Sequence, residues 1–508
     1  MPYFMGVDIG TYESKGVIID GRCNVVAVHA EKHGMENPCP NFFEHDAEEV
    51  WWGDFCKISR RLLEKAGLKG KDIAAVGAST LGADLVPVDE NCVPLRKAIL
   101  YGIDARAKKE IEYLNDYYGL EKVQEFNGRP LCSNDIPPKM LWLKNNEPEI
   151  HEKAYKLITG STFIFAKLTG RYCIDRFLGL GSFSPLYNPE TLQPDEEYVP
   201  MFCRADQLAE IAETVSPAGC VTAKAAAETG LAEGTPVIVG GDDSLSEAIS
   251  TGVLETGELM LQFGSSLYLA GISDKRIHDK RVWSGGYIIP NTFSVQGGTN
   301  AAGTLTRWYR DNIFFDALAR EEETGKNAYE LMMEGIDEIP IGSDGLLTLP
   351  YIAGERTPLN DPEARGILCG LSIGHTRRHM YRSALESIGY SVSQHLEIFA
   401  ENGVKIDKIY AVGGGTKNKA WIQIIADICG KEIQTAEVTI GAAFGDAAMA
   451  AIGVGHFAGF ASLREFIAPG ERFVPNMENH EKYKKYRRLF DRLYEATKDI
   501  VHELNAGD

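Results

Sequence analysis

The sequence predicts an α/β protein with two domains, and three observations support that prediction. The chain has 508 residues, which is too long for one compact core. Apolar strand-like runs alternate with segments of helical periodicity along most of its length. A pattern of strand, glycine, hydroxyl residues and strand occurs twice, about half the chain apart. We therefore expect two related halves, residues 1–247 and 248–508.

Composition narrows the classes of protein that fit. Hydrophobic residues make up 44% of the chain and charged residues 24%, which is the balance of a globular protein. The formal net charge is −20, so we expect neither a nucleic acid nor an anionic membrane as a partner. No apolar run approaches the roughly 20 residues that a membrane helix needs.

Two further features favour a cytoplasmic protein. The ten cysteines are scattered and include no CxxC pair, which is typical of reduced thiols rather than of a disulfide framework or a zinc site. The N-terminal MPYFMGVDIGT has no basic stretch before an apolar core. It therefore predicts the first strand of a fold rather than a signal peptide.

The first chemical motif is a hairpin that begins at Gly6. Asp8 comes at the end of an apolar strand, and Gly10 lets the backbone turn into a second strand. Thr11 and its neighbours can offer N–H and hydroxyl donors to a phosphate, while Asp8 is placed to hold a metal ion or a water. The alternative is a plain hairpin with a structural aspartate.

The second hairpin repeats this pattern in the other half of the chain. An apolar strand runs into Gly264, Ser265 and Ser266 and continues as another strand. Two such hairpins suggest a duplicated domain that holds a nucleotide from both sides. Because the repeated pattern is short, coincidence is the alternative.

Two more strands end in residues suited to binding. The first leads through two glycines to Asp242 and Asp243 and then into a helix, at the edge of an α/β sheet where ligands bind. Helix-starting acids are the alternative reading of this pair. The second leads through Gly413–Gly415, where a phosphate or a flat ligand can press against backbone, into a helix that Gly430 is placed to end.

Together these motifs resemble the FGGY family of carbohydrate kinases, and the resemblance covers nearly the whole chain in the family's order. The matching segments are Asp8–Lys15, Phe42–Trp52, Ile73–Arg106, Lys139–Leu143, Gly241–Asp242, Gly264–Ser266, Gly297–Arg310, Gly354–Pro358, Ala364–Glu386, Gly413–Gly415 and Gly441–Ala447. The resemblance implies two actin-like (ribonuclease H-like) domains with an ATP cleft between them.

The resemblance also implies a role for individual residues. Asp242 matches the aspartate that takes the proton from the sugar hydroxyl, and Asp8 matches the one near the magnesium ion and the transferring phosphate. The residues that match the family's nucleotide-binding positions are Gly10, Thr11, Gly264, Ser265, Ser266, Gly303, Gly414, Gly415 and Asn418.

The sugar pocket departs from the family pattern. At the family's sugar-contacting position in the first domain, xylulose kinases have a pair like Met-His and glycerol kinases a pair like Arg-Glu. This sequence has Gly82-Ala83 there, followed by Asp84. Asp104 and Arg106 stand in a second altered stretch, so we expect a changed sugar pocket formed by these residues and Asp242. A structural ion pair between Asp104 and Arg106 is the alternative to sugar contacts.

The resemblance implies ATP-dependent phosphorylation of a small carbohydrate, with Mg²⁺ as the second cofactor and a ketopentose such as D-xylulose as the default substrate. Kinases for L-ribulose, gluconate or a tetritol remain alternatives, as does a non-catalytic sugar sensor. A nucleotide-driven conformational machine is disfavoured by the Gly354–Pro358 segment. The family often forms dimers, so the resemblance leaves a homodimer open, and the sequence does not fix the oligomeric state.

Overall fold

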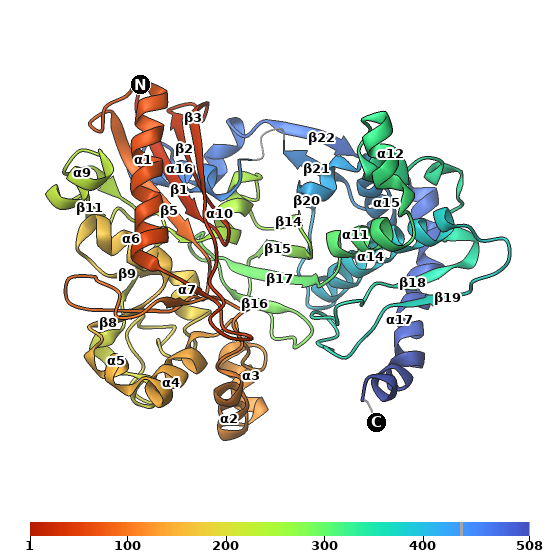
Figure 1. The fold of residues 1–508 in the computed structure, drawn as a ribbon, viewed down its shortest axis with the longest axis horizontal. Coiled ribbons are helices and arrows are strands. Elements are labelled where there is room, and N and C mark those ends of the chain that lie inside the picture. The colour runs from red at the N-terminus through yellow and green to blue at the C-terminus, as the bar shows by residue number, and fades with distance from the viewer. Residues whose placement is uncertain (437–439, 507–508) are drawn as a thin grey trace. The chain divides into compact units, whose positions relative to one another are not determined.

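The computed structural model describes residues 1–436 and 440–506, which divide into two compact units (Figure 1). Unit 1 comprises Met1–Glu255, Ser284–Ser294 and Ile440–Ala468. Unit 2 comprises the described parts of Thr256–Trp283, Val295–Thr439 and Pro469–Asp508. The predicted two-domain α/β class is confirmed, whereas the boundary between residues 247 and 248 stays a prediction.

Unit 1 is built on one mixed sheet with strand order β11-β12-β5-β1-β2-β3, and β13 also pairs with β5. Its strands are β1 (Tyr3–Ile9), β2 (Glu13–Asp20), β3 (Val25–Lys32), β5 (Ile73–Thr80), β11 (Gly219–Cys220), β12 (Pro236–Val237) and β13 (Gly241–Asp242). β1 and β2 form the predicted N-terminal hairpin, while β5 lies parallel to β1 on its other side. The carboxyl ends of β1, β5 and β13 therefore meet at one edge of the sheet.

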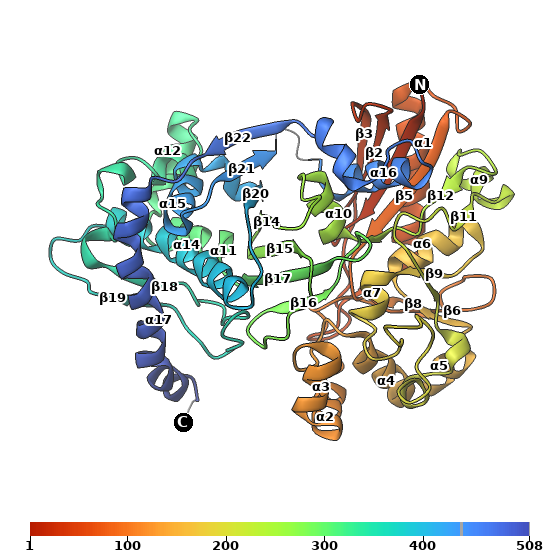
Figure 2. The ribbon, with the colours of Figure 1, turned by 180° about the vertical axis from the view of Figure 1, so that it is seen from behind.

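Two helices cover opposite faces of this sheet, and glycines let them approach closely (Figures 1 and 2). A Cβ on Gly16 of β2 would lie 2.3 Å from Ile58 of α1 (Gly53–Ala66). A Cβ on Gly6 of β1 would lie 2.0 Å from the carbonyl of Ala443 in α16 (Ala442–Gly453). α16 comes late in the chain, yet it packs on β1 and β5.

The rest of unit 1 consists of short elements. The strands are β4 (Glu44–His45), β6 (Val86–Val88), β7 (Ala98–Ile99), β8 (Lys156–Ile158), β9 (Cys173–Asp175) and β10 (Glu210–Ala212). The helices are α2 (Lys108–Tyr118), α3 (Leu120–Asn127), α4 (Ile136–Asn146), α5 (Pro148–Lys153), α6 (Gly160–Thr169), α7 (Arg176–Leu180), α8 (Val199–Phe202), α9 (Ala223–Thr229) and α10 (Asp243–Ser250).

A second mixed sheet has the strand order β16-β17-β15-β14-β20-β21-β22. It belongs to unit 2 except for residues 284–286 of β16 and 293–294 of β17, which fall in a segment of unit 1. Its strands are β14 (Glu258–Phe263), β15 (Leu267–Ser273), β16 (Trp283–Gly286), β17 (Phe293–Thr299), β20 (Lys408–Gly413), β21 (Ile433–Ala436) and β22 (Pro469–Phe473). β14 and β15 form the second predicted hairpin, and β20 lies parallel to β14.

The helices of unit 2 include one that the sequence pattern predicts closely. α15 (Lys419–Cys429) buries Trp421, Ile424, Ile425 and Ile428 and ends at Gly430, whose φ is 60°. α17 (Met477–Asn505) is a long helix near the C-terminus. The remaining elements are α11 (Gly303–Asn312), α12 (Asp316–Thr324), α13 (Ala328–Met332), α14 (Arg377–Glu401), β18 (Leu347–Leu349) and β19 (Ile367–Cys369).

Within residues 1–436 and 440–506, every helix is too short or too polar to span a bilayer.

Candidate active site

Asp8 lies at the carboxyl end of β1, on the strand that leads into the first hairpin turn. Its Oδ1 accepts a hydrogen bond from the Ser79 hydroxyl on β5, at 3.1 Å. Desolvation, together with the nearby charges of Glu247 and Asp242, raises the pKa of Asp8 to about 7. The protein therefore provides a carboxylate here whose charge is only weakly compensated, which suits a cation.

Asp242 ends β13 and forms the N-cap of α10. Its Oδ1 accepts from the Ser244 backbone N–H at 2.9 Å, from the Leu245 N–H at 3.3 Å, and also from the Ser244 hydroxyl. This capping role is common for aspartate, and it leaves Oδ2 for other contacts. Burial raises the pKa of Asp242. One oxygen thus orients the side chain, while the other is available as a proton acceptor.

Asp243 adds to the negative charge around Asp242. Burial raises its pKa well above the usual range, and the neighbouring charges of Asp242, Asp8 and Glu247 raise it further. Like charges in a shared interior disfavour one another's ionised form. The four carboxylates therefore form one acidic region at the edge of the unit 1 sheet.

Magnesium fits this acidic region as a partly protein-bound ion. Among residues 1–436 and 440–506, no group of three or more His, Cys, Asp or Glu side chains is arranged to hold a metal. Mg²⁺ is usually held by one or two carboxylates, with phosphate oxygens and water completing its octahedron. A single ligand such as Asp8 agrees with that pattern.

The turn of the first hairpin contains Gly10 and Thr11. The Gly10 N–H donates to the Glu13 carbonyl at 3.2 Å, and a Cβ on Gly10 would lie 2.7 Å from that oxygen. The Thr11 hydroxyl lies 3.2 Å from the Tyr101 hydroxyl. The turn therefore needs glycine at its first position and presents a hydroxyl residue at its second.

Gly82 and Ala83 follow β5, and Gly82 lies against Asp242. A Cβ on Gly82 would lie 1.9 Å from Asp242 Oδ2, so a larger residue would displace that carboxylate. Ala83 has a φ of 59°, and its carbonyl accepts a 2.8 Å hydrogen bond from the buried Lys139. The Gly-Ala pair therefore sets the space beside the Asp242 carboxylate.

Asp84 is fully buried behind this pair. Its Oδ1 accepts from the Gly160 N–H at the start of α6, at 2.8 Å, whereas its Oδ2 has no hydrogen-bond partner among the described residues. Burial raises the pKa of Asp84 to about 7, with Asp242 adding to the shift. An unpartnered buried carboxyl oxygen is costly unless a ligand satisfies it.

Asp104 and Arg106 form a buried ion pair in the same unit. Arg106 donates to Asp104 Oδ1 and Oδ2 at 2.8–3.0 Å and to Glu44 Oε1 at 2.8 Å. Their side chains are 0% and 1% exposed, respectively. The guanidinium is therefore committed to protein carboxylates, as the ion-pair alternative describes.

The structure adds Asp175, which sequence reasoning missed. Its Oδ1 caps α7 through the Phe177 and Leu178 N–H groups at 2.9 and 3.1 Å, while its buried Oδ2 lacks a partner within the described part of the chain. Burial raises its pKa to about 7, and the charge of Asp242 contributes. The available signal was its position at the end of the short apolar strand β9.

Unit 2 brings together the predicted nucleotide residues at the carboxyl ends of β14 and β20. The Gly303 N–H donates to the Gly264 carbonyl at 3.1 Å, and the Thr304 N–H to the Ser265 carbonyl at 2.9 Å. A Cβ on Gly303 would lie 2.4 Å from the Gly264 oxygen, so only glycine lets α11 begin this close to the turn.

The glycine run after β20 lies against the same strand end. A Cβ on Gly415 would lie 2.8 Å from Phe263 Cβ, whereas the one on Gly414 would meet nothing within 4 Å. Asn418 caps α15 by accepting from the Trp421 N–H at 3.1 Å. Gly414 thus offers open backbone, which is what a flat ligand requires.

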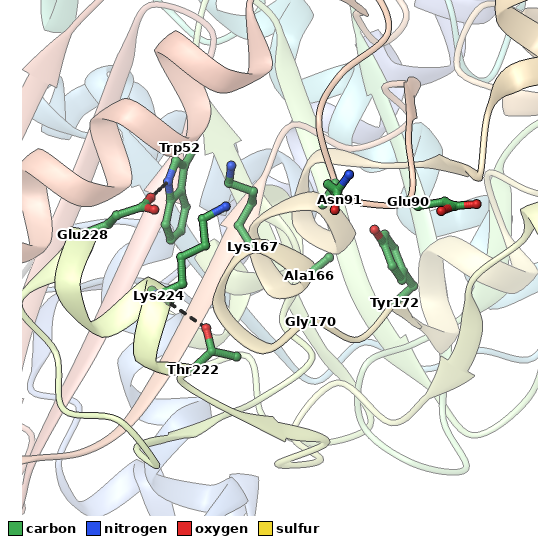
Figure 3. Close-up of a pocket in the computed structure, with 12 residues that line it drawn as sticks. Trp52, Glu90, Asn91, Ala166, Lys167, Gly170, Tyr172, Thr222, Lys224 and Glu228 are labelled. Atoms are coloured by element: carbon green, nitrogen blue, oxygen red, sulfur yellow. Dashed lines mark hydrogen bonds between the residues drawn. The ribbon is translucent and has the colours of Figure 1, made fainter.

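A pocket of about 310 Å³ lies elsewhere in unit 1 (Figure 3). Trp52, Lys167, Lys224 and Glu228 contribute to its lining, and the Trp52 indole N–H donates to Glu228 at 2.6 Å. None of the predicted catalytic or binding residues lines it. We therefore assign it no part in the reaction.

Comparisons with known proteins identify the family of this chain. The N-terminal domain model of the FGGY family of carbohydrate kinases matches residues 3–250, and the C-terminal domain model matches residues 259–454. The chain belongs to this family. It is a carbohydrate kinase, and ATP is the phosphate donor that the family uses.

Individual relatives cover the full length of this family member. A xylulose kinase of Staphylococcus epidermidis is 30% identical, with 98% of each chain aligned. A gluconokinase of Bacillus licheniformis is 26% identical over 97% of this chain and 96% of its own. The crystal structure of xylulose kinase from Rhodospirillum rubrum superimposes with a TM-score of 0.90 at 26% identity, covering 98% of this chain and all of that one.

Proposed function

We propose that this kinase transfers the γ-phosphate of ATP to a hydroxyl of a neutral ketopentose, with D-xylulose as the preferred substrate. This proposal rests on the two carboxylate oxygens of Asp242, which have different surroundings. Its Oδ1 is held by the start of α10, while its Oδ2 lies beside Gly82, where no side chain intrudes. A carboxylate held in this way can accept a proton from a bound alcohol.

In the proposed reaction, the sugar hydroxyl oxygen attacks the γ-phosphorus as its proton passes to Asp242 Oδ2. The bond between the γ-phosphorus and the β–γ bridging oxygen breaks, and ADP leaves with that oxygen. Phosphoryl transfer depends mainly on alignment and charge stabilisation, so one well-placed base suffices. The protonated Asp242 then returns its proton to water.

Asp8 would hold Mg²⁺ together with phosphate oxygens, and the ion would offset the charge on the transferring phosphate when bound. The turns at Gly10–Thr11 and Gly264–Ser266 supply donors for the phosphates, and Gly303, Gly414, Gly415 and Asn418 approach the nucleotide. These assignments rest on family position and on the backbone contacts described above.

Charge favours a neutral sugar over a sugar acid. The charge of Asp242 raises the pKa of both Asp84 and Asp175. Each has one buried oxygen with no hydrogen-bond partner among residues 1–436 and 440–506, and that oxygen can accept from a sugar hydroxyl. The buried cations nearby are already engaged, Lys139 with the Ala83 carbonyl and Arg106 with Asp104. A carboxylate substrate such as gluconate would add repulsion without gaining a partner.

A substrate panel tests this proposal. ADP formation is measured with ATP and Mg²⁺ against D-xylulose, L-ribulose, erythritol and gluconate at equal concentrations. We expect the highest kcat/KM with D-xylulose and the lowest with gluconate. A preference for gluconate would overturn the assignment of a neutral substrate. The cytoplasmic location and the homodimer stay predictions.

A further inference from the structure

A continuous set of hydrogen bonds connects α10, α16 and the end of β1. Ser246 Oγ donates to Asp446 Oδ1 at 2.8 Å, and Ser79 Oγ lies 2.7 Å from Asp446 Oδ2. The same Ser79 Oγ lies 3.1 Å from Asp8 Oδ1. Asp446, Ser79 and Ser246 are all essentially inaccessible to solvent. The Asp8 carboxylate is thus linked to a second, deeper carboxyl group through one serine.

The backbone places Asp446 there by unusually close packing. A Cβ on Gly77 of β5 would lie 2.5 Å from the Asp446 carbonyl. A Cβ on Gly445 would lie 2.0 Å from the Ser246 carbonyl on α10. Glycines on a strand and on a helix therefore let α16 approach both β5 and α10, so that the short Asp446 side chain reaches Ser79.

The number of hydrogens available between Asp446, Ser79 and Asp8 decides which group donates and which accepts. The Ser79 hydroxyl has a single hydrogen but lies between two carboxyl groups, so a second proton is needed for both contacts to be hydrogen bonds. Both oxygens of Asp446 contact serine hydroxyls rather than a cation. Burial raises the pKa of Asp446 well above its usual range, and the charge of Asp8 adds to the effect.

We infer that Asp446 is a positioning residue for Asp8: its neutral carboxyl group donates to Ser79, so that the Ser79 hydrogen points to Asp8 Oδ1 and fixes that carboxylate. This inference rests on the proposed role of Asp8 toward the Mg²⁺–nucleotide. Partners that orient a metal-binding carboxylate typically contribute 10–100-fold to metal affinity or activity. A side chain that only fastens α16 to α10 would have no such specific effect.

Binding measurements on the full chain separate these two roles. Isothermal titration calorimetry gives the Kd of ADP with and without Mg²⁺ for the wild type, Asp446→Ala and Asp446→Asn. We expect Asp446→Ala to weaken Mg²⁺–ADP binding by about 10–100-fold while ADP alone binds as in the wild type. Asp446→Asn should stay near the wild type, because its amide can donate to Ser79 and accept from Ser246.

Controls keep the outcomes distinct. Tyr187→Phe removes a buried 2.7 Å hydrogen bond to the Ala209 carbonyl in the same unit and should leave the Mg²⁺ effect intact. If Asp446→Ala does not fold, Ser79→Ala breaks the link at its centre and should show the same selective loss. Unchanged Mg²⁺–ADP affinity in the folded variant would overturn the inference. If Mg²⁺ does not change the ADP affinity of the wild type, the proposed role of Asp8 is overturned, and this inference with it.

Discussion

The two hairpins share a backbone plan but carry different chemistry. In each, a strand leads into glycine and a hydroxyl residue, and a parallel strand lies alongside, β5 beside β1 and β20 beside β14. Two residues before the glycine stands Asp8 in unit 1 and Gln262 in unit 2. The same position is therefore an acid in one unit and a neutral amide in the other.

The strands beside the hairpins differ in the same way. β5 and β13 end next to Gly82 and Asp242, in a region of buried carboxylates. β20 ends at Gly413. Gly413 and Gly415 lie against Phe263, whereas Gly414 is open. In the proposed reaction, unit 1 supplies charged groups for proton transfer and metal binding, while unit 2 supplies backbone for nucleotide binding.

The largest expected effect comes from removing the proposed base in unit 1. Asp242→Asn keeps an oxygen to cap α10 but cannot accept the proton. We expect kcat to fall by about 10²–10⁴-fold, the usual contribution of a general base, with sugar KM nearly unchanged. Steady-state kinetics measure both constants, and Ser250→Ala, which removes a hydroxyl that donates to a backbone carbonyl on the same helix, serves as the control. Near-normal turnover of Asp242→Asn would contradict the role given to Asp242.

The next prediction compares Asp8 with Gln262, the acid and the neutral amide at matching positions of the two hairpins. Asp8→Asn removes the charge of the proposed ligand itself, so we expect the Mg²⁺ concentration for half-maximal activity to rise by at least about 100-fold, the upper end of what loss of a ligand-orienting partner costs. Gln262→Asn shortens a neutral amide and should leave that concentration unchanged. Magnesium titrations of both variants provide the comparison. Equal shifts would show that the two hairpins share the metal-binding role.

A third prediction concerns the division between chemistry and nucleotide binding. In Gly303→Ala, the new Cβ would lie 2.4 Å from the Gly264 carbonyl and push α11 away from the hairpin turn. Overpacking typically costs 1–3 kcal/mol, so we expect KM for ATP to rise about tenfold or more, with a smaller change in kcat.

Gly82→Ala is the matched change in unit 1. It should lower kcat rather than raise KM for ATP, because its Cβ would displace Asp242 Oδ2. Kinetics with varied ATP distinguish the two variants. If Gly82→Ala raises KM for ATP and Gly303→Ala does not, the proposed division of chemistry to unit 1 and nucleotide binding to unit 2 is contradicted.

The final prediction is a pH dependence of stability in unit 1, which concerns folding rather than turnover. The pKa of Asp84 is raised from 3.8 to about 7 in the folded chain, so between these values the folded state retains a proton that the unfolded state has lost. Its stabilising contribution is full below about pH 4 and is lost as the pH rises through about 7.

Asp84→Asn removes this dependence. Relative to the variant, the wild type should lose up to about 1.4 kcal/mol of stability per pH unit over this range. Urea denaturation at pH values from 4 to 8, monitored by a spectroscopic signal from unit 1, measures the difference in the free energy of unfolding between the two proteins. A constant difference across the range would show that Asp84 is ionised throughout.

Sequence reasoning predicted the features that depend on neighbouring residues. The two hairpins, the position of Asp242 at a strand end, and the helix from Lys419 to Cys429 follow from local periodicity and from the placement of glycine. These features can be recognised because each motif lies within about a dozen residues. The α/β class follows from their order.

The features that were missed depend on contacts between distant segments. Ser79 and Asp446 are 367 positions apart and meet only because α16 packs on β5. The unpartnered oxygen of Asp175 becomes meaningful only when the fold brings it near Asp242. Likewise, whether Arg106 faces a sugar or a carboxylate depends on Glu44, which lies far from it in the sequence.

The proposed reaction is tested most directly by phosphorus NMR of the wild-type protein with ATP, Mg²⁺ and D-xylulose. One sugar phosphate should appear for each ADP formed, and ADP formation should nearly stop when the sugar is omitted. Release of inorganic phosphate at the same rate with and without sugar would contradict it, as would tight D-xylulose binding without any turnover.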